Sequence, residues 1–297
     1  MKYGKVENPS LVDFTLPADH SSTKKILSSQ KSKEFNVYVG CAKWNRTDLK
    51  GFYPRGTKDE LTYYSTQFNS IELNATFYNM PSKEQIIKWK DKTPANFKFF
   101  PKITNSISHY RRLLNVKELV DVYCDSVAHF EEKLGMVFLQ LNEQFSPNEF
   151  NKLKEFLEYF PQVIPLAVEV RNEKWFSDSK AWDDFCTLLE ENKVTNMITD
   201  VAGRRDMIHQ RLTTPTAFIR FTGCNVDEID YQRMDDWLAR IKKWQKEGLQ
   251  NLYFFVHQNR EVSSPMLSAY FTKKINTMFD KDLVIPKIAN NTNPQLS

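Results

Sequence analysis

Glycine is scarce in this 297-residue sequence, and its eight glycines form no phosphate-binding loop. Neither a GxGxxG nor a GxxxxGK(S/T) turn follows any predicted strand, which excludes the common dinucleotide-binding and P-loop folds. No apolar run approaches the roughly 20 residues that a membrane helix needs. The N-terminus also lacks the apolar core of a secretory signal. We therefore expect a soluble, cytoplasmic protein without membrane contacts.

Cysteine is equally sparse, and the sequence contains neither a CxxC pair nor a Cys/His pair with metal-ligand spacing. Four widely separated cysteines in so long a chain do not make a disulfide framework, so we expect them to be reduced. They are Cys41, Cys124, Cys186 and Cys224.

Neither sign of charge dominates the sequence, which has 41 basic and 37 acidic residues. Residues 35–297 hold 35 of the basic and 33 of the acidic residues, so the body of the chain is nearly balanced. A module that binds duplex nucleic acid usually shows a stronger basic bias. Composition therefore argues against such a module, although it leaves room for a local basic cleft. The apolar fraction of 41% is sufficient for a sizeable core.

From residue 35 onward, short runs rich in β-branched and aromatic residues alternate with longer amphipathic runs. One helical run begins with Ser146 as N-cap and Pro147 at the first helical position, and another ends at Gly248. Residues 201–215, after the sixth strand, make a poor helix and predict an irregular loop. The eight predicted strands are residues 35–40, 70–75, 97–103, 136–141, 165–170, 194–199, 217–221 and 251–257.

Eight strands separated by helices predict an α/β fold of the TIM-like (β/α)8 barrel type, as a single domain over residues 35–285. An open, doubly wound sheet is the alternative. Residues 1–34 include a stretch rich in Ser and Lys without an apolar period, which is typical of a flexible or loosely packed arm. We expect the barrel to fold without this arm. Residues 286–297 are predicted to form a C-terminal tail.

Polar residues gather where the predicted strands end, and in a barrel of this kind the active site lies at the C-terminal ends of the strands. Along the second and fifth strands, polar residues alternate with apolar ones, so the polar side chains are expected to point inward. Buried charges need partners, which predicts one shared polar network near the barrel mouth. The inward polar residues considered are Glu72, Asn74, Lys102, Glu169, Arg171 and Arg220.

The chain also resembles the YecE-like family of unknown function, from about residue 35 to residue 279. The resemblance is carried by VGCAKW, FNSIELNATFYNMPS, TPANFKFFPKITNSISH, LGMVFLQLNEQF, LAVEVRNEKWF, FIRFTG and YFFVHQN, in this order. It implies a TIM-like barrel and no established activity. The polar positions that it implies are Glu72, Asn74, Tyr78, Lys102, His109, Glu169, Arg171, Asp200, Arg220 and Asn259.

The first functional hypothesis is an enzyme, a hydrolase, lyase or isomerase, that acts on or binds an anionic small molecule without a metal. Lys102, Arg171 and Arg220 would hold a phosphate or carboxylate. The candidate catalytic residues are Glu72 or Glu169 as general base, His109 as general acid, and Asp200. Further candidate ligand-binding residues are Asn74, Tyr78, Trp175, His257 and Asn259. The structural alternative is that the charged residues form a salt-bridge network with no ligand.

Two other hypotheses stay open at this point. A metal-assisted phosphoesterase, endonuclease or sugar isomerase would hold a divalent ion with Glu72, Glu169, Asp200 and His257. Arg171 lies two residues after Glu169 on the same face of the predicted strand, and a nearby positive charge disfavours a metal ion. We therefore expect no metal or other cofactor. A non-catalytic nucleic-acid-binding protein would instead use aromatic residues near the barrel mouth to stack on bases. Those aromatic residues are Trp44, Tyr53, Phe77, Tyr78 and Trp175.

Overall fold

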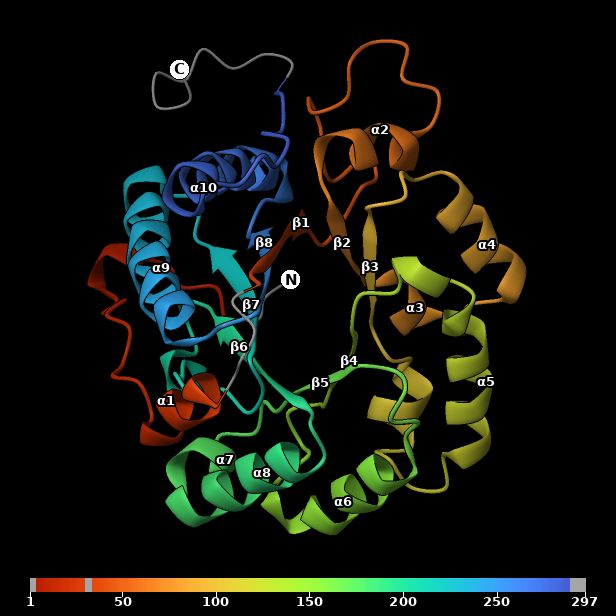
Figure 1. The fold of residues 1–297 in the computed structure, drawn as a ribbon, viewed down its shortest axis with the longest axis vertical. Coiled ribbons are helices and arrows are strands. Elements are labelled where there is room, and N and C mark those ends of the chain that lie inside the picture. The colour runs from red at the N-terminus through yellow and green to blue at the C-terminus, as the bar shows by residue number, and fades with distance from the viewer. Residues whose placement is uncertain (1–3, 30–33, 289–297) are drawn as a thin grey trace.

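In the computed structural model, which describes residues 4–29 and 34–288, eight parallel strands form the centre of the protein (Figure 1). Six are hydrogen-bonded in the order β1-β8-β7-β6-β5-β4, and β2 pairs with β3. Each overlaps one of the predicted strands, which are thereby confirmed. The strands are β1 Asn36–Cys41, β2 Ser70–Leu73, β3 Lys98–Pro101, β4 Val137–Gln140, β5 Leu166–Glu169, β6 Thr195–Asp200, β7 Thr216–Gly223 and β8 Asn251–Gln258.

Side-chain contacts and isolated bridges join the two sheets. Between β1 and β2, Asn69 donates from Nδ2 to the Val37 carbonyl at 2.8 Å and accepts from the Val39 amide at 2.9 Å. Gly40 permits this close approach, because an added Cβ would lie 2.3 Å from the Ser70 carbonyl oxygen. Isolated bridges join β3 to β4. The structure thus confirms an α/β fold with a curled six-stranded parallel sheet. It does not confirm a fully closed (β/α)8 barrel, since the ladder is interrupted at both junctions.

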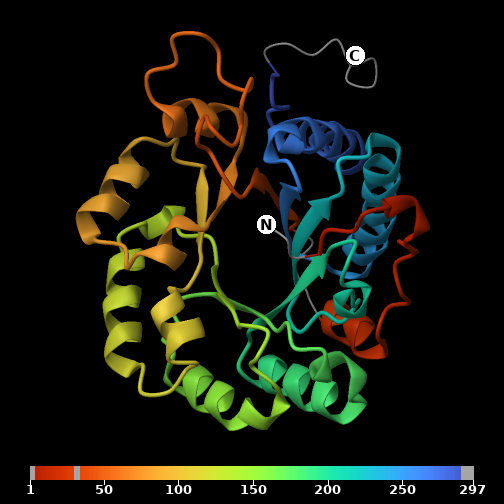
Figure 2. The ribbon, with the colours of Figure 1, turned by 180° about the vertical axis from the view of Figure 1, so that it is seen from behind.

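Helices surround the strands in a ring, as Figures 1 and 2 show from opposite sides. Ser146, the predicted N-cap, forms a capping box with Glu149, and Gly248 ends α9 with a left-handed φ of 118°. None of the helices in the described ranges is long and apolar enough to cross a membrane. The α-helices are α1 Ser21–Ser28, α2 Glu60–Gln67, α3 Ala75–Tyr78, α4 Lys83–Asp91, α5 Lys117–Ala128, α6 Phe150–Tyr159, α7 Lys174–Ser177, α8 Ser179–Glu191, α9 Asp227–Glu247 and α10 Ser264–Phe279.

Short helical turns occupy several of the connections. The loop after β6 is irregular apart from one such turn, as the sequence predicted. These turns are η1 Pro9–Leu11, η2 Ser106–Tyr110, η3 Glu131–Lys133, η4 Pro147–Glu149, η5 Arg205–Met207 and η6 Glu261–Ser263.

The N-terminal arm is packed on the body, which corrects the prediction of a flexible or loosely packed segment. Asp19 forms ion pairs with Arg240, at 2.6 Å, and with Lys243, both on α9. Leu27 on α1 is fully buried in a core cluster. The ring of Phe14 lies 4.4 Å from the Arg233 guanidinium. These anchors are single residues at uneven spacing along the arm, so no apolar period reveals them in the sequence. Residues 1–3 and 30–33 lie outside the described residues.

The C-terminal tail is described only as far as residue 288. The backbone amide of Lys287 donates to Oε1 of Gln67 at 2.9 Å, which attaches the start of this segment to α2. The remainder of the predicted tail, residues 289–297, lies outside the described residues.

Candidate functional site

The inner face of the curled sheet carries an aromatic layer, and a polar layer follows it two residues further along the strands. The aromatic layer packs tightly: ring centroids of Phe100 and Phe255 are 4.9 Å apart, and those of Phe100 and Phe218 are 5.7 Å apart. Because side chains alternate with period two, the next inward residues lie toward the C-terminal ends of the strands. The inward pairs are Phe100 and Lys102, Phe138 and Gln140, Ala167 and Glu169, Phe218 and Arg220, and Phe255 and His257.

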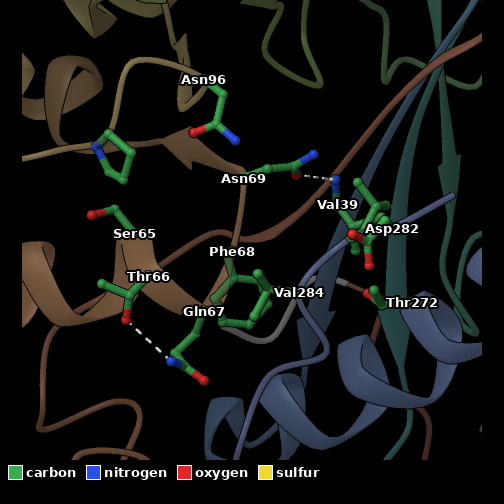
Figure 3. Close-up of a pocket in the computed structure, with 12 residues that line it drawn as sticks. Val39, Ser65, Thr66, Gln67, Phe68, Asn69, Asn96, Thr272, Asp282 and Val284 are labelled. Carbon is green, nitrogen blue, oxygen red and sulfur yellow. Dashed lines mark hydrogen bonds between the residues drawn. The ribbon is translucent and has the colours of Figure 1, made fainter.

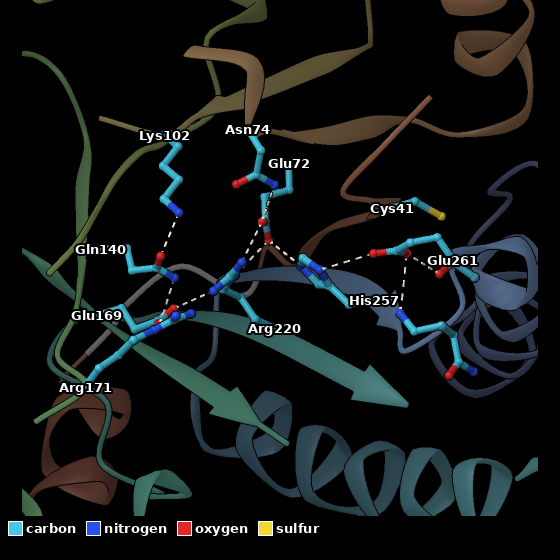
Figure 4. Close-up of polar contacts among 12 residues, drawn as sticks. Cys41, Glu72, Asn74, Lys102, Gln140, Glu169, Arg171, Arg220, His257 and Glu261 are labelled. Atoms are coloured by element: carbon cyan, nitrogen blue, oxygen red, sulfur yellow. Dashed lines mark hydrogen bonds and ion pairs between the residues drawn. The ribbon is translucent and has the colours of Figure 1, made fainter. Parts of the chain in front are cut away.

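The polar layer forms a group of interacting side chains that we call the central cluster (Figure 4). Arg220 lies at its middle, between the carboxylates of β2 and β5. Its Nε and Nη2 donate to the two oxygens of Glu72 at 2.9 and 2.8 Å, and its Nη1 donates to Glu169 at 2.7 Å. Arg171 donates from Nε to the other oxygen of Glu169. The central cluster consists of Glu72, Asn74, Lys102, Gln140, Glu169, Arg171, Arg220 and His257.

Lys102 enters the central cluster through an amide rather than through a carboxylate. Its Nζ donates to Oε1 of Gln140 at 2.6 Å, and Nε2 of Gln140 donates to Glu169 at 3.0 Å. The same ammonium group lies 4.0 Å from the centroid of the Phe77 ring. The Lys102 amine therefore contacts the neutral amide of Gln140 and the ring face of Phe77, and the Gln140 amide separates it from the Glu169 carboxylate.

The carboxylate of Glu72 is saturated by donors from three directions. Besides Arg220, Asn74 donates to its Oε1 at 2.8 Å, and Nε2 of His257 lies 3.0 Å from its Oε2. Glu72 is completely buried. Its position is therefore fixed by a network that spans β2, β7 and β8.

The cationic groups of the central cluster lower the pKa values of both of its carboxyls. Burial alone raises the pKa of both carboxyls, but the guanidiniums outweigh it. Arg171 and Arg220 hold the pKa of Glu169 at about 2. Arg220 and His257 hold the pKa of Glu72 well below its usual range.

The Lys102 amine has a pKa near neutrality. Burial, together with the neighbouring Arg220 and Arg171, lowers the pKa of Lys102 to about 7. Burial and the nearby Lys102 also lower the pKa of His109 to about 4. The predicted acid and base roles do not suit these environments. A carboxylate with so low a pKa is a weak base, and His109, which is neutral near pH 7, is a poor general acid.

Two of the predicted catalytic and ligand-binding residues face away from the central cluster. Asp200 points toward α9, where Arg233 and the Trp237 indole nitrogen lie 2.9 and 2.8 Å from its oxygens. The alternation of β6 explains this, because Thr199 and not Asp200 belongs to the inner face. Trp175 is fully buried and donates from its indole nitrogen to the Phe145 carbonyl at 2.8 Å. Both side chains therefore stabilise the fold, and the structure does not bring them into the central cluster.

Three further candidates lie at the margin of the site. Tyr78 is 65% exposed and packs its ring edge-on against Phe77. His109 lies on η2 and packs its ring against the same Phe77, with centroids 4.8 Å apart. Asn259 is half-buried and follows directly after β8. These residues border the central cluster and are not among its members.

Sequence reasoning missed two inward residues, Gln140 and Thr199. Gln140 connects Lys102 to Glu169, and Thr199 occupies the corresponding level of β6. The signal for both was present, since each follows an inward apolar residue, Phe138 or Met197, by two positions.

The described residues contain no group of three or more His, Cys, Asp and Glu side chains arranged to hold a metal ion. The hypothetical set of Glu72, Glu169, Asp200 and His257 is divided, because Asp200 lies on the outer face of the sheet. The two carboxylates that remain inside are bound by Arg220. This arrangement does not fit a divalent cation.

A separate cavity of about 290 Å³ lies beside the starts of β2 and β3, away from the central cluster (Figure 3). Ser65, Asn69, Asn96 and Thr272 line it together with the segment that follows α10. It contains none of the predicted site residues. One of its lining residues, Asn69, directly precedes β2 and forms the two hydrogen bonds that attach this segment to β1.

Acid should weaken the protein through the buried carboxylates. The pKa values of Glu72, Glu169 and Asp200 are lowered in the folded state, that of Glu169 to about 2. Their contribution to stability is therefore complete above the unfolded values of about 4 and is lost as the pH falls through the folded values. We expect the free energy of unfolding, measured by urea denaturation, to fall steeply between about pH 4.5 and pH 2. Glu169→Gln should show a shallower fall than wild type; an equally steep fall would contradict the assignment.

Comparison with known proteins places the sequence among uncharacterised relatives. The profile of the family described as "Protein of unknown function DUF72" matches residues 38–290. UPF0759 protein YecE of Escherichia coli K12 is 25% identical over 252 residues, which cover 78% of this chain and 89% of YecE. UPF0759 protein YunF of Bacillus subtilis is 30% identical over 155 residues, which cover 48% of this chain and 52% of YunF.

Solved structures show the same fold. A DUF72 family protein from Enterococcus faecalis V583 has a TM-score of 0.65 and 17% identity, and the match covers 84% of this chain and 100% of that chain. A DUF72 family protein from Thermotoga maritima MSB8 has a TM-score of 0.65 and 24% identity, with 83% and 100% covered. At these identities the similarity concerns the arrangement of strands and helices.

Proposed function

Because the chain belongs to the DUF72 family, whose function is unknown, we propose from its own geometry that the central cluster binds the anionic group of a small phosphorylated or carboxylated molecule. The membership confirms the resemblance to YecE-like proteins. In this proposal the curled sheet and the β2–β3 pair act as one TIM-like barrel. The ligand then lies at the C-terminal ends of its strands, where binding sites of such barrels are found.

The observation that carries the proposal is the charge balance of the central cluster. Within it, Lys102, Arg171 and Arg220 supply three cationic side chains and Glu72 and Glu169 supply two carboxylates, while the Glu261 carboxylate lies outside it, 3.9 Å from Nδ1 of His257. Arg220 contacts both carboxylates, and Arg171 contacts one of them. Protonated Lys102 donates to a neutral amide, so an anion beside it would add an opposite charge and raise its pKa.

A buried hydroxyl supports the same conclusion. The Oγ1 atom of Thr199 is buried and has no hydrogen-bond partner among the residues that the structure describes. Thr199 pairs in register with Arg220, so it lies in the polar layer. Leaving a buried hydroxyl without a partner costs about 1–3 kcal/mol. A ligand oxygen or a water molecule in the site would accept its hydrogen.

Calorimetric titration with inorganic phosphate and with oxalate tests the proposal. We expect wild-type protein to bind at least one of them, and Lys102→Met to bind it about tenfold or more weakly, since a hydrogen bond from a charged group is lost. Lys98→Met is the matched control, because Lys98 starts the same strand and its Nζ reaches the Glu132 carbonyl instead. It should bind like wild type.

Equal binding by the Lys102→Met and wild-type proteins would show that the anion binds elsewhere. Absence of binding by wild-type protein to either probe at millimolar concentration would contradict the proposal itself. Circular dichroism on each variant confirms that the fold is retained before the affinities are compared.

A further inference from the structure

We infer that the Lys102 amine is a nucleophile that forms an imine with the carbonyl group of a 2-oxo carboxylate bound in the central cluster. This inference rests on the proposed anion binding and names the substrate class. It adds a covalent step to that binding. Lys102, which performs the step, directly follows Pro101, the last residue of β3.

The position of Lys102 differs from that of the two arginines in the central cluster. Both arginines contact a carboxylate directly. Lys102 instead donates to the amide of Gln140 and lies over the ring of Phe77. Only 7% of the residue is exposed. A buried amine beside other cations and without a carboxylate partner loses its proton readily, which is how lysines that form Schiff bases are activated.

The pKa of Lys102, lowered to about 7, means that a large fraction of the amine is unprotonated at neutral pH. An ordinary lysine, with a pKa of about 10.4, is almost entirely protonated there. Several charged or titratable groups act on this amine from the surrounding elements. They are Arg220 on β7, Arg171 after β5, Glu169 on β5, Glu72 on β2 and His109 on η2.

The same surroundings select the substrate class. An imine-forming lysine needs a carbonyl carbon at its Nζ, and the adjacent guanidiniums favour a carboxylate close to that carbon. Arg171 keeps 13% of its side chain exposed, so it lies where the cluster meets solvent. A 2-oxo carboxylate has its carboxylate bonded directly to the carbonyl carbon, which matches a lysine and an arginine in one small cluster.

The covalent step is balanced without a further reactant. The Nζ lone pair attacks the carbonyl carbon, and the π electrons of the carbonyl move to its oxygen. One amine hydrogen passes to that oxygen to give a carbinolamine. The C–O bond then breaks, the C=N bond forms, and the oxygen leaves as water with both original amine hydrogens. Protonation of the imine nitrogen by solvent gives the iminium ion.

Reductive trapping tests the inference on the full-length protein. Pyruvate and sodium cyanoborohydride are added at neutral pH, hydride adds to the iminium carbon, and the resulting secondary amine is located by peptide mass spectrometry. We expect the adduct on Lys102, with none on that peptide in Lys102→Arg. Lys98→Arg should be labelled like wild type. At pyruvate concentrations well below saturation, the labelling rate should rise with pH through about 7, the pKa of the amine in the unliganded protein.

Acetone, in which a methyl group replaces the carboxylate of pyruvate, tests the substrate class. We expect it to label Lys102 about tenfold or more slowly, since it lacks the charge-assisted contacts. Equal rates would overturn the assignment to 2-oxo carboxylates.

Failure of the imine and failure of anion binding are distinguishable. If phosphate or oxalate binds to wild-type protein but pyruvate leaves Lys102 unlabelled, the imine inference is overturned and the binding proposal stands. Labelling spread over many lysines, with Lys102 not preferred, would also overturn it.

Discussion

Arg220→Met is expected to lower the free energy of unfolding by about 3–5 kcal/mol, because it leaves two buried carboxylates without their shared cation. Arg220 makes three hydrogen bonds to Glu72 and Glu169, and all three side chains are at most 8% exposed. Removing one partner of a buried ion pair costs more than removing the whole pair. Urea denaturation at pH 7 measures the loss.

The matched control removes the two carboxylate charges together with the Arg220 guanidinium. In the triple variant Glu72→Gln, Glu169→Gln and Arg220→Met, we expect part of the lost stability to return, because no buried carboxylate is left without its shared cation. The single variant should also become relatively more stable toward acid, since its carboxyls then have raised pKa values and are neutralised as the pH falls. A loss below about 1 kcal/mol in Arg220→Met, the range of an exposed ion pair, would contradict this account.

Deletion of residues 1–29 is expected to lower the free energy of unfolding by about 4 kcal/mol or more. Burial of Leu27 alone contributes about 2 kcal/mol. The half-buried ion pairs of Asp19 with α9 contribute about 1 kcal/mol. The deletion also uncovers the Arg233 guanidinium, on which Phe14 packs. Thermal and urea unfolding of the shortened chain measure the effect.

Single substitutions show how much each anchor of the arm contributes to the loss of unfolding free energy in the deletion variant. Leu27→Ala should account for the largest part, and Asp19→Asn for about 1 kcal/mol or less. Substitution of the exposed Leu11, on η1, by Ala is the control and should leave stability unchanged. An unchanged unfolding midpoint after the deletion would instead agree with the loosely packed arm expected from composition.

Local patterns in the sequence were sufficient for the elements of the fold. Every predicted strand is present, and the helix that begins after Ser146 and the one that ends at Gly248 have the expected caps. These features depend on side-chain alternation and on backbone preferences of neighbouring residues, which act within a few positions of the chain. The inward direction of Glu72 and Glu169 followed from the same alternation.

The order of the elements and the faces on which their polar residues lie can therefore be derived from the sequence alone. Which of these polar residues contact one another depends on the tertiary structure. It paired Arg220 with carboxylates from two distant strands, turned Asp200 toward α9, and attached the arm through Asp19. It also buried Lys102 near Arg220 and Arg171, which lowers the pKa of its amine to about 7. The physical reason is that ion pairing and burial depend on distances between segments far apart in the chain, which no local pattern contains.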